Sequence, residues 1–182
     1  KNQKTHWWFS VRRELISNFL KKYSKKNNLK ILDYGCGSGT NIKALTKFGK
    51  VYCYEKDRRT LEYLSSEFKK DKKVIILKDL KGQIKYDCII LADVLEHIKD
   101  DSKALKNLKK ILKPYGQILI TVPAYNFLFS KKDEVLKHFR RYGYNEIKNL
   151  ISKNFKILRI SFFNTLLFLP IKLASPIGLH AE

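Results

Sequence analysis

Apolar side chains near the start of the chain recur at a helical spacing. Between residues 7 and 23 they occupy positions 8, 11, 15, 16, 19 and 20, and this spacing places them on one face of an α-helix. The pattern therefore predicts an amphipathic first helix laid against a core. Apolar periodicity and capping residues predict four further helices, over residues 38–48, 61–68, 104–112 and 144–151.

Between these helical segments lie short runs that are apolar throughout. Read as strands, they cover residues 31–32, 51–54, 74–77, 88–91, 118–122 and 155–160, and residues 123–139 are expected to be irregular. Continuously apolar strands that alternate with helices are typical of a parallel sheet covered on both faces. The sequence thus predicts an α/β fold, a Rossmann-like, doubly wound and mostly parallel sheet with helices on both faces. We expect ligands beyond the carboxyl ends of its strands.

The composition indicates a globular protein with an excess of positive charge. Hydrophobic residues make up 44% of the 182 positions and aromatic residues 13%, more than a disordered chain carries. Lys and Arg total 38 against 17 Asp and Glu, a formal charge of +21, which favours acidic partners. Nucleic-acid recognition relies on bidentate Arg, whereas 31 of these cations are Lys. A nucleic acid is therefore not the favoured partner, although RNA stays open as an alternative.

The cysteines and the apolar runs bear on the cellular compartment. Cys36, Cys53 and Cys88 are odd in number and lack CxxC spacing, so neither a disulfide framework nor a zinc knuckle is expected. With no signal-peptide pattern and no uninterrupted apolar stretch of about 18 residues, we expect a cytoplasmic protein. The apolar residues 160–177, interrupted by Pro170 and Lys172, leave a peripheral membrane contact open as the alternative.

A glycine-rich turn follows the first predicted strand. Residues 33–39 read D-x-G-x-G-x-G, and Thr40 stands where the dinucleotide fingerprint requires a third glycine. The lysine of a phosphate-binding P-loop is absent as well. Glu55, at the end of the next strand, can accept hydrogen bonds from both hydroxyls of a ribose. Together these residues indicate a nucleoside site.

Five segments in sequence carry a family resemblance. These segments are, in order, ILDYGCGSGTNIKAL, VYCYEKD, LKDL, YDCIILADVLEHIKD and LKPYGQILITVPA. They resemble the motifs of class I S-adenosylmethionine-dependent methyltransferases, and the resemblance covers most of the chain. The resemblance implies a transferase that binds S-adenosylmethionine (SAM) and releases S-adenosylhomocysteine. It implies Glu55 as the ribose acid and Asp79 near the adenine. The cofactor-binding residues implied in this way are Asp33, Tyr34, Gly35, Cys36, Gly37, Gly39, Glu55, Lys56, Asp79, Leu80 and Asp93.

A narrower resemblance concerns both ends of the chain. The segment HWWF before Arg12 and Arg13, and the H-x-R-R-Y segment over residues 138–142, are similar to a bacterial and archaeal subgroup acting on small molecules or glycans. In that subgroup the first helix and the loop after the fifth strand cover the cofactor. The resemblance implies a cofactor-covering helix over residues 1–28 and a Rossmann-like domain over residues 29–182. The short stretch before the expected last strand, residues 177–182, departs from the family and indicates that the C-terminal part is truncated.

Methyl transfer to a hydroxyl requires the loss of a proton, and His97 and His138 are the candidate general bases. No resident metal is expected. The alternative is a divalent ion held by Asp93, Glu96, His97 and His138, because methyltransferases of the ubiquinone pathway and of small RNAs with a similar motif use a metal. Arg140, Arg141 and Tyr142 are candidate substrate contacts.

The expected function is methyl transfer from SAM to a heteroatom, with oxygen favoured, of a small metabolite, a sugar or a lipid-linked glycan. Two alternatives remain: an RNA methyltransferase, which the charge motivates, and a SAM-binding module without catalytic activity. The acceptor itself is not specified by these motifs, since a fold hosts many functions.

Overall fold

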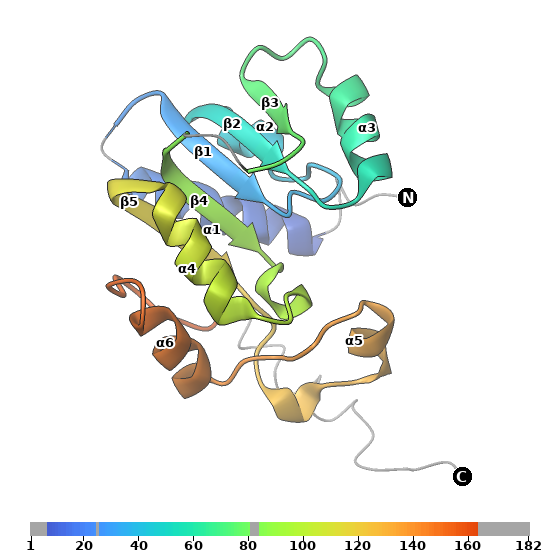
Figure 1. The fold of residues 1–182 in the computed structure, drawn as a ribbon, viewed down its shortest axis with the longest axis vertical. Coiled ribbons are helices and arrows are strands. Elements are labelled where there is room, and N and C mark those ends of the chain that lie inside the picture. The colour runs from blue at the N-terminus through green and yellow to red at the C-terminus, as the bar shows by residue number, and fades with distance from the viewer. Residues whose placement is uncertain (1–6, 25, 81–83, 164–182) are drawn as a thin grey trace. The chain divides into compact units, whose positions relative to one another are not determined.

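The computed structural model describes residues 7–24, 26–80 and 84–163 (Figure 1). They form two compact units. The first comprises the chain up to Leu95 together with Lys106–Thr121, and the second comprises Glu96–Leu105 and the chain from Val122 onward. The sequence did not predict this division.

The first unit is built on a parallel sheet of five strands in the order β3-β2-β1-β4-β5. The strands are β1 (Leu29–Tyr34), β2 (Gly49–Tyr54), β3 (Val74–Leu77), β4 (Tyr86–Ala92) and β5 (Leu112–Thr121). All four pairings are parallel. The strand order reverses direction between β1 and β4, which is where open α/β sheets bind ligands. The predicted doubly wound α/β fold is confirmed.

Helices cover both faces of this sheet. They are α1 (Trp7–Tyr23), α2 (Ile42–Leu45), α3 (Arg58–Glu67) and the part of α4 (Asp101–Ile111) that follows Lys106. Figure 1 shows α1 and α2 behind the sheet and α4 in front of it. Ile16 and Leu20 of α1 are fully buried in one cluster with Ile31, Cys53 and Ile90. Burying each large aliphatic side chain contributes about 1.5–3 kcal/mol, so α1 is an integral part of this core.

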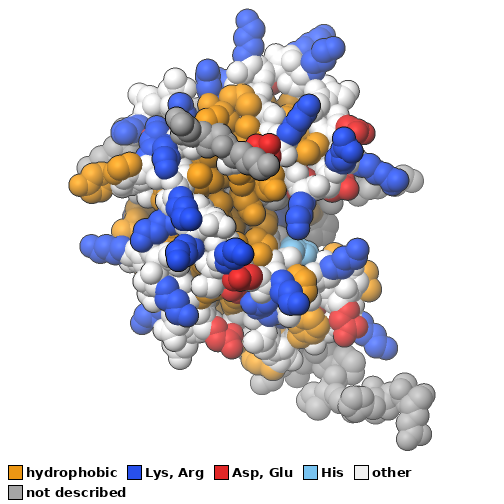
Figure 2. Space-filling model, in the orientation of Figure 1, with side chains coloured by type: hydrophobic (Ala, Val, Ile, Leu, Met, Phe, Trp, Pro, Cys, Tyr) orange, Lys and Arg blue, Asp and Glu red, His pale blue; other side chains and the backbone are white. Residues whose placement is uncertain are grey.

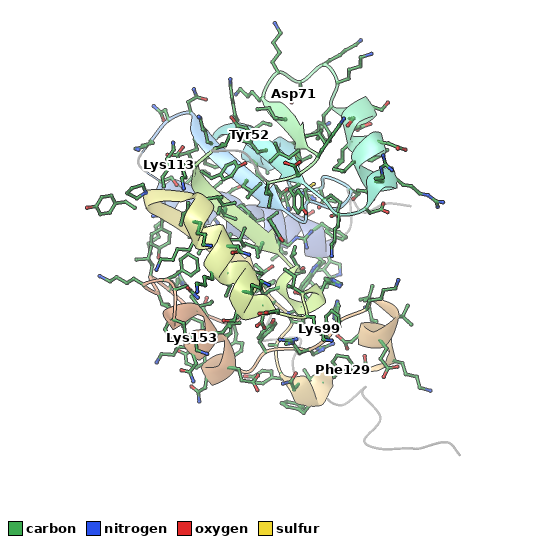
Figure 3. The ribbon with its side chains drawn as sticks, in the orientation of Figure 1. Tyr52, Asp71, Lys99, Lys113, Phe129 and Lys153 are labelled. Carbon is green, nitrogen blue, oxygen red and sulfur yellow. The ribbon has the colours of Figure 1, made fainter. Side chains whose placement is uncertain are left out.

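Two side-chain contacts connect strands of this sheet, and the first spans across β1. Tyr52 on β2, labelled in Figure 3, packs edge-on against Tyr86 of β4 with ring centroids 5.3 Å apart. The ammonium group of Lys113 lies 2.8 Å from the carboxylate of Asp87, which also accepts a hydrogen bond from the backbone N–H of Lys30. Asp87 therefore links β4 to the starts of β1 and β5.

The second unit joins the segment after β4 to the chain after β5. It contains η2 (Asn126–Leu128), α5 (Lys131–Val135) and α6 (Tyr144–Ser152). Ala124 and Tyr142 form a parallel bridge, and the backbone N–H of Phe139 donates to the carbonyl of Glu96 at 2.8 Å. These contacts bring residues 138–142 beside the start of the unit.

Three local predictions are corrected. The helix expected over residues 38–48 is reduced to α2 because Gly39, at φ +79°, keeps the chain out of the helical region until Asn41. The segment expected to be irregular, residues 123–139, contains η2 and α5, the latter started by a capping box between Ser130 and Asp133. Residues 155–160 form no strand, because no neighbouring strand within the described ranges pairs with them.

The expected strand over residues 177–182 and most of the apolar stretch 160–177 lie outside the described residues. Among the helices that are described, none combines the length and the apolar character needed to cross a membrane.

Candidate active site

The glycine-rich turn lies between β1 and α2 and is fixed by the neighbouring strand. The N–H groups of Gly35 and Cys36 donate to the carbonyl of Tyr54 at 2.7 and 3.1 Å. A side chain at Gly37 would meet no atom within 4 Å, although its φ of +51° disfavours one. The turn therefore presents bare backbone to open space, where a flat ligand can approach closely.

Glu55 follows β2 and faces this turn. Its Oε2 accepts a hydrogen bond from the N–H of Gly37 at 3.0 Å, and its Oε1 accepts one from Lys56 at 2.6 Å. Oε1 also accepts the N–H of Asp57 at 3.3 Å, so the remaining acceptor capacity is on Oε2. Glu55 is thus held beside the glycine turn with acceptor capacity left for the hydroxyls of a ribose.

The other predicted cofactor residues follow neighbouring strands of the same unit. The ring of Tyr34 is half-buried and lies 5.2 Å from that of Tyr54. Asp79 is exposed and Leu80 half-buried, just after β3, which pairs with β2. The sheet register thus collects these residues at the carboxyl edge, as the sequence predicted.

A buried polar group lies behind the glycine turn. Asp33, at 1% exposure, lies one residue before the end of β1; Arg12, at 7%, comes from α1; and Asn41, at 3%, precedes α2. Asp33 Oδ2, Arg12 Nε and Asn41 Oδ1 have no hydrogen-bond partner in the part of the chain that the structure describes. Buried polar atoms are normally paired. A ligand carrying both a donor and an acceptor, such as an α-amino acid, would satisfy this set.

Burial raises the pKa of Asp33 to about 7; the charge of Arg12 and a hydrogen bond with the Asn41 side chain oppose this rise, and the charge of Glu55 adds to it. A buried carboxyl prefers its neutral form unless a cation is close. An ammonium group bound at Asp33 would therefore stabilise its ionised form.

Arg12 also fixes the end of β4. Its Nη1 donates to Asp93 Oδ2 at 2.7 Å, and its Nη2 reaches Thr40 Oγ1 at 3.3 Å. The other oxygen of Asp93 accepts a hydrogen bond from Thr121 Oγ1 at 2.8 Å. Asp93, predicted as a cofactor contact, is therefore engaged by α1 and β5. In the sequence, Arg12 belongs to a family motif and has no further predicted role. It lies on the same face of the helix as the buried Ile16 and Leu20, and this spacing is the signal from which its burial could have been predicted.

Three potential ligand side chains come together in the second unit. The donor atoms of Glu96, His97 and His138 lie within 4.8 Å of one another. The imidazole rings of His97 and His138 meet edge-on, with centroids 4.6 Å apart. Two imidazoles and one carboxylate are a donor set that suits divalent transition metals. This group includes three of the four residues considered for a metal; Asp93 does not belong to it.

Asp133 engages both His138 and Arg141. Its carboxylate lies 2.8 Å from His138 Nδ1 and 2.9 Å from Arg141 Nη2. Burial favours a higher pKa, but hydrogen bonds from Arg141 and His138 outweigh it and hold the pKa of Asp133 well below its usual range. Asp133 is a residue to which the sequence pattern assigned no role.

Arg140 and Tyr142 meet at a second carboxylate. Arg140 Nη1 and the hydroxyl of Tyr142 both donate to Asp101 Oδ2, at 2.8 and 2.9 Å. Arg140 Nη2 also donates to the carbonyl of Lys99, labelled in Figure 3. These side chains are held inside the unit, and their predicted contact with substrate stays a prediction.

Figure 2 shows Lys and Arg scattered over the drawn face of each unit, with apolar surface between them. On this face the cations are dispersed, whereas nucleic-acid-binding proteins cluster theirs in a patch or stripe.

Comparison with known proteins adds a family relationship. Residues 7–165 match the family described as a methyltransferase domain. An uncharacterized protein of Methanocaldococcus jannaschii is 31% identical over 171 residues, which cover 90% of this chain and 71% of the relative. The ubiquinone biosynthesis O-methyltransferase of Pelagibacter ubique is 28% identical over 140 residues, 70% of this chain and 58% of that enzyme.

A solved structure shows the same fold. Magnesium protoporphyrin IX methyltransferase from Synechocystis, crystallised with bound S-adenosylhomocysteine, aligns with a TM-score of 0.67 at 16% identity, over 83% of this chain and 75% of that one. At this identity the likeness concerns the fold alone.

Proposed function

The chain belongs to the methyltransferase domain family, and we propose that it transfers a methyl group from SAM to an oxygen atom of a small acceptor. The observation that carries this proposal is the set of buried polar atoms on Arg12, Asp33 and Asn41 that have no hydrogen-bond partner within the described chain. They lie behind a glycine turn whose position 37 faces open space.

These residues fit the two ends of SAM. Glu55 would accept hydrogen bonds from the ribose hydroxyls beside Gly37, and Asp79 and Leu80 would flank the base. Asp33 would accept from the ammonium group of the amino-acid moiety, and Arg12 Nε would donate to its carboxylate. When bound, SAM supplies the methyl group on a sulfonium leaving group. The solved relative that holds S-adenosylhomocysteine supports this choice of cofactor.

The proton of the acceptor needs a base. An attacking hydroxyl becomes a good nucleophile only as it loses its proton, and His97 and His138 are the groups proposed to accept it. Neutral imidazole is suited to this role near pH 7. Oxygen is favoured as the atom methylated because a relative is named as an O-methyltransferase.

The second candidate mechanism uses a divalent metal. Glu96, His97 and His138 bring their donor atoms within 4.8 Å of one another, which supports a site for Mn²⁺, Zn²⁺ or a similar ion. Such an ion lowers the pKa of a bound hydroxyl and orients it. The two mechanisms predict opposite responses to a chelator, and activity retained in its presence would favour the base.

For the acceptor we propose a class of molecules and not one compound. A small metabolite, a sugar or a lipid-linked glycan is favoured over RNA because the cations are mostly dispersed lysines. We propose a cytoplasmic protein, with a peripheral membrane contact through residues 160–177 as a subsidiary hypothesis. A methyltransferase assay tests the proposal: release of S-adenosylhomocysteine from SAM is followed with pools of hydroxylated metabolites, sugars, lipid-linked glycans and RNA.

Turnover with one of the first three pools, abolished by Asp33→Ala, supports the proposal. Turnover with RNA alone, with an affinity for RNA that falls steeply as the salt concentration rises, would show that the acceptor is RNA and not a small molecule. Binding of SAM without turnover on any pool would instead favour the non-catalytic module.

A further inference from the structure

The carboxylate of Asp133 is bonded to three side chains of the second unit, those of Ser130, His138 and Arg141, and the proposed reaction does not use it directly. Asp133 is 2% exposed. Its Oδ2 accepts hydrogen bonds from the N–H of Ser130 at 2.9 Å, from Ser130 Oγ at 3.0 Å and from Arg141 Nη2 at 2.9 Å. Its Oδ1 accepts from Arg141 Nε at 3.0 Å. Arg141 thus holds this carboxylate with two donors, one on each oxygen.

This geometry determines which ring nitrogen of His138 carries the proton. A carboxylate paired with Arg in this two-pronged way is ionised and can only accept hydrogen bonds. His138 Nδ1 lies 2.8 Å from Asp133 Oδ1, so Nδ1 must be the donor. In the neutral imidazole the other nitrogen, Nε2, then has a free lone pair.

We propose that Asp133 is a positioning residue: it fixes the tautomer and the ring orientation of His138, so that the unprotonated Nε2 is the atom offered beside Glu96 and His97. The arrangement is a carboxylate–histidine dyad, in which a carboxylate orients a neighbouring imidazole. That this Nε2 takes part in catalysis rests on the proposed function. The hydrogen bond between Asp133 and His138 does not depend on the proposed function.

The backbone supports the same orientation. The N–H of His138 donates to the carbonyl of Asp133 at 2.9 Å, and the next residue, Phe139, donates to the carbonyl of Glu96 at 2.8 Å. Ser130 begins α5 directly after Phe129, which Figure 3 labels. His138 is therefore tied by backbone and side chain to the turn that also carries Asp133, while its ring meets that of His97 edge-on.

The dyad separates the roles of the two histidines. The side chain of His138 is 10% exposed and bonded to Asp133, whereas His97 is exposed. The contact of His138 Nδ1 with Asp133 holds the His138 ring in one orientation. His138 is accordingly the favoured base of the two, and Arg141 acts through Asp133.

Nuclear magnetic resonance tests the dyad without substrate. Long-range ¹H–¹⁵N correlation spectra of the ¹⁵N-labelled chain distinguish the two tautomers of a neutral histidine, and His138→Gln identifies the signals of residue 138. We expect wild-type His138 as the Nδ1–H tautomer, and we expect Asp133→Ala to abolish this preference while leaving the His97 tautomer in place. Wild-type His138 protonated at Nε2 would overturn the proposal whatever the variants do.

A milder variant serves as a control in case Asp133→Ala does not fold. Ser130→Ala removes one donor to Asp133 but leaves the Asp133–His138 hydrogen bond, so the Nδ1–H tautomer should persist. If Asp133→Ala folds and retains this tautomer, Asp133 does not position His138 and the proposal is wrong.

Turnover provides a separate readout once an acceptor is known. Asp133→Asn should lower kcat about 10- to 100-fold with little change in the Kd for SAM. Failure to find an acceptor would count against the proposed function and leave the spectroscopic result intact. A Kd for SAM that rises while kcat stays constant would contradict the positioning role.

Discussion

The guanidinium of Arg12 and the carboxylate of Asp93 form an ion pair 2.7 Å long, although the two residues stand 81 positions apart. Arg12 comes from α1 and Asp93 follows β4, so the pair fastens the first helix to the carboxyl edge of the sheet. The Arg12 side chain is 8% exposed and that of Asp93 25%. Because the pair is largely shielded from water, removing one partner leaves the other charge partly buried and unpaired, which costs more than breaking an exposed ion pair.

Arg12→Met should lower the free energy of unfolding by about 2 kcal/mol, since it leaves a partly buried carboxylate without its charged donor. Arg13→Met changes the neighbouring arginine, whose Nη2 donates to the exposed Ser10, and should cost less than about 0.5 kcal/mol. Chemical denaturation measures both. The double variant Arg12→Met with Asp93→Asn should be less destabilised than the sum of its parts, and strict additivity would show that the pair is not coupled.

The raised pKa of Asp33 makes stability depend on pH. In the folded chain Asp33 holds its proton up to about pH 7, whereas the unfolded chain releases it near the ordinary value of 3.8. The folded state therefore binds more protons between these values, and the contribution of Asp33 to stability falls as pH rises from about 4 to about 7.

Thermal unfolding without SAM checks this sign. Asp33→Asn cannot ionise and should be more stable than wild type at pH 8, with the difference vanishing near pH 4. A difference that is the same at both pH values would contradict the assigned pKa.

Gly37 and Gly39 should respond differently to alanine. A side chain at Gly39 would lie 2.8 Å from both Ile42 Cδ1 and Leu64 Cδ2, in addition to its φ of +79°. Gly39→Ala should therefore destabilise the fold by about 2–3 kcal/mol. Gly37→Ala should cost only about 1 kcal/mol, because its surroundings are open, yet weaken SAM binding by filling the space that the ligand needs. Equal effects of both variants on stability and binding would contradict this division.

The Glu96, His97 and His138 cluster can be tested with a metal alone. If it is a metal site, calorimetry with Mn²⁺ or Zn²⁺ should detect one bound ion, and Glu96→Gln should weaken binding at least about 10-fold. Glu134→Gln changes an exposed acid on α5 and serves as the control. Unchanged affinity in Glu96→Gln would exclude this cluster as the site.

Much of the fold followed from patterns that depend on local physics. Uniformly apolar strands predicted the parallel sheet, and residues 74–77 were assigned to the strand that the structure contains. The helix expected from residue 38 starts later because the positive φ of Gly39 keeps the chain out of helical geometry before Asn41. The strand expected over residues 155–160 lacks a partner in the described sheet, and apolar character cannot specify pairing.

Less of the candidate site than of the fold could be predicted from the sequence. The glycine turn and Glu55 were recognisable because their spacing is local. The site also contains two ion pairs, Arg12–Asp93 and Asp133–Arg141. Each forms because the fold brings two charged residues together, either from distant segments or across a turn. The order of residues in the sequence does not show that these charges lie close. Arg140 and Arg141 were candidate substrate contacts in the sequence, and the structure pairs each of them with a carboxylate.

The most direct test of the central claim is isothermal titration with SAM and S-adenosylhomocysteine, with NADH as the control ligand. It compares wild type, Glu55→Ala and Glu62→Ala, the last removing an exposed acid on α3. We predict micromolar binding of both SAM and S-adenosylhomocysteine, no binding of NADH, a loss of at least about 10-fold (1.4 kcal/mol) in Glu55→Ala and no change in Glu62→Ala. Binding of NADH in preference to SAM, or SAM affinity that Glu55→Ala leaves unaltered, would contradict the assignment of the glycine turn and Glu55 as the SAM site.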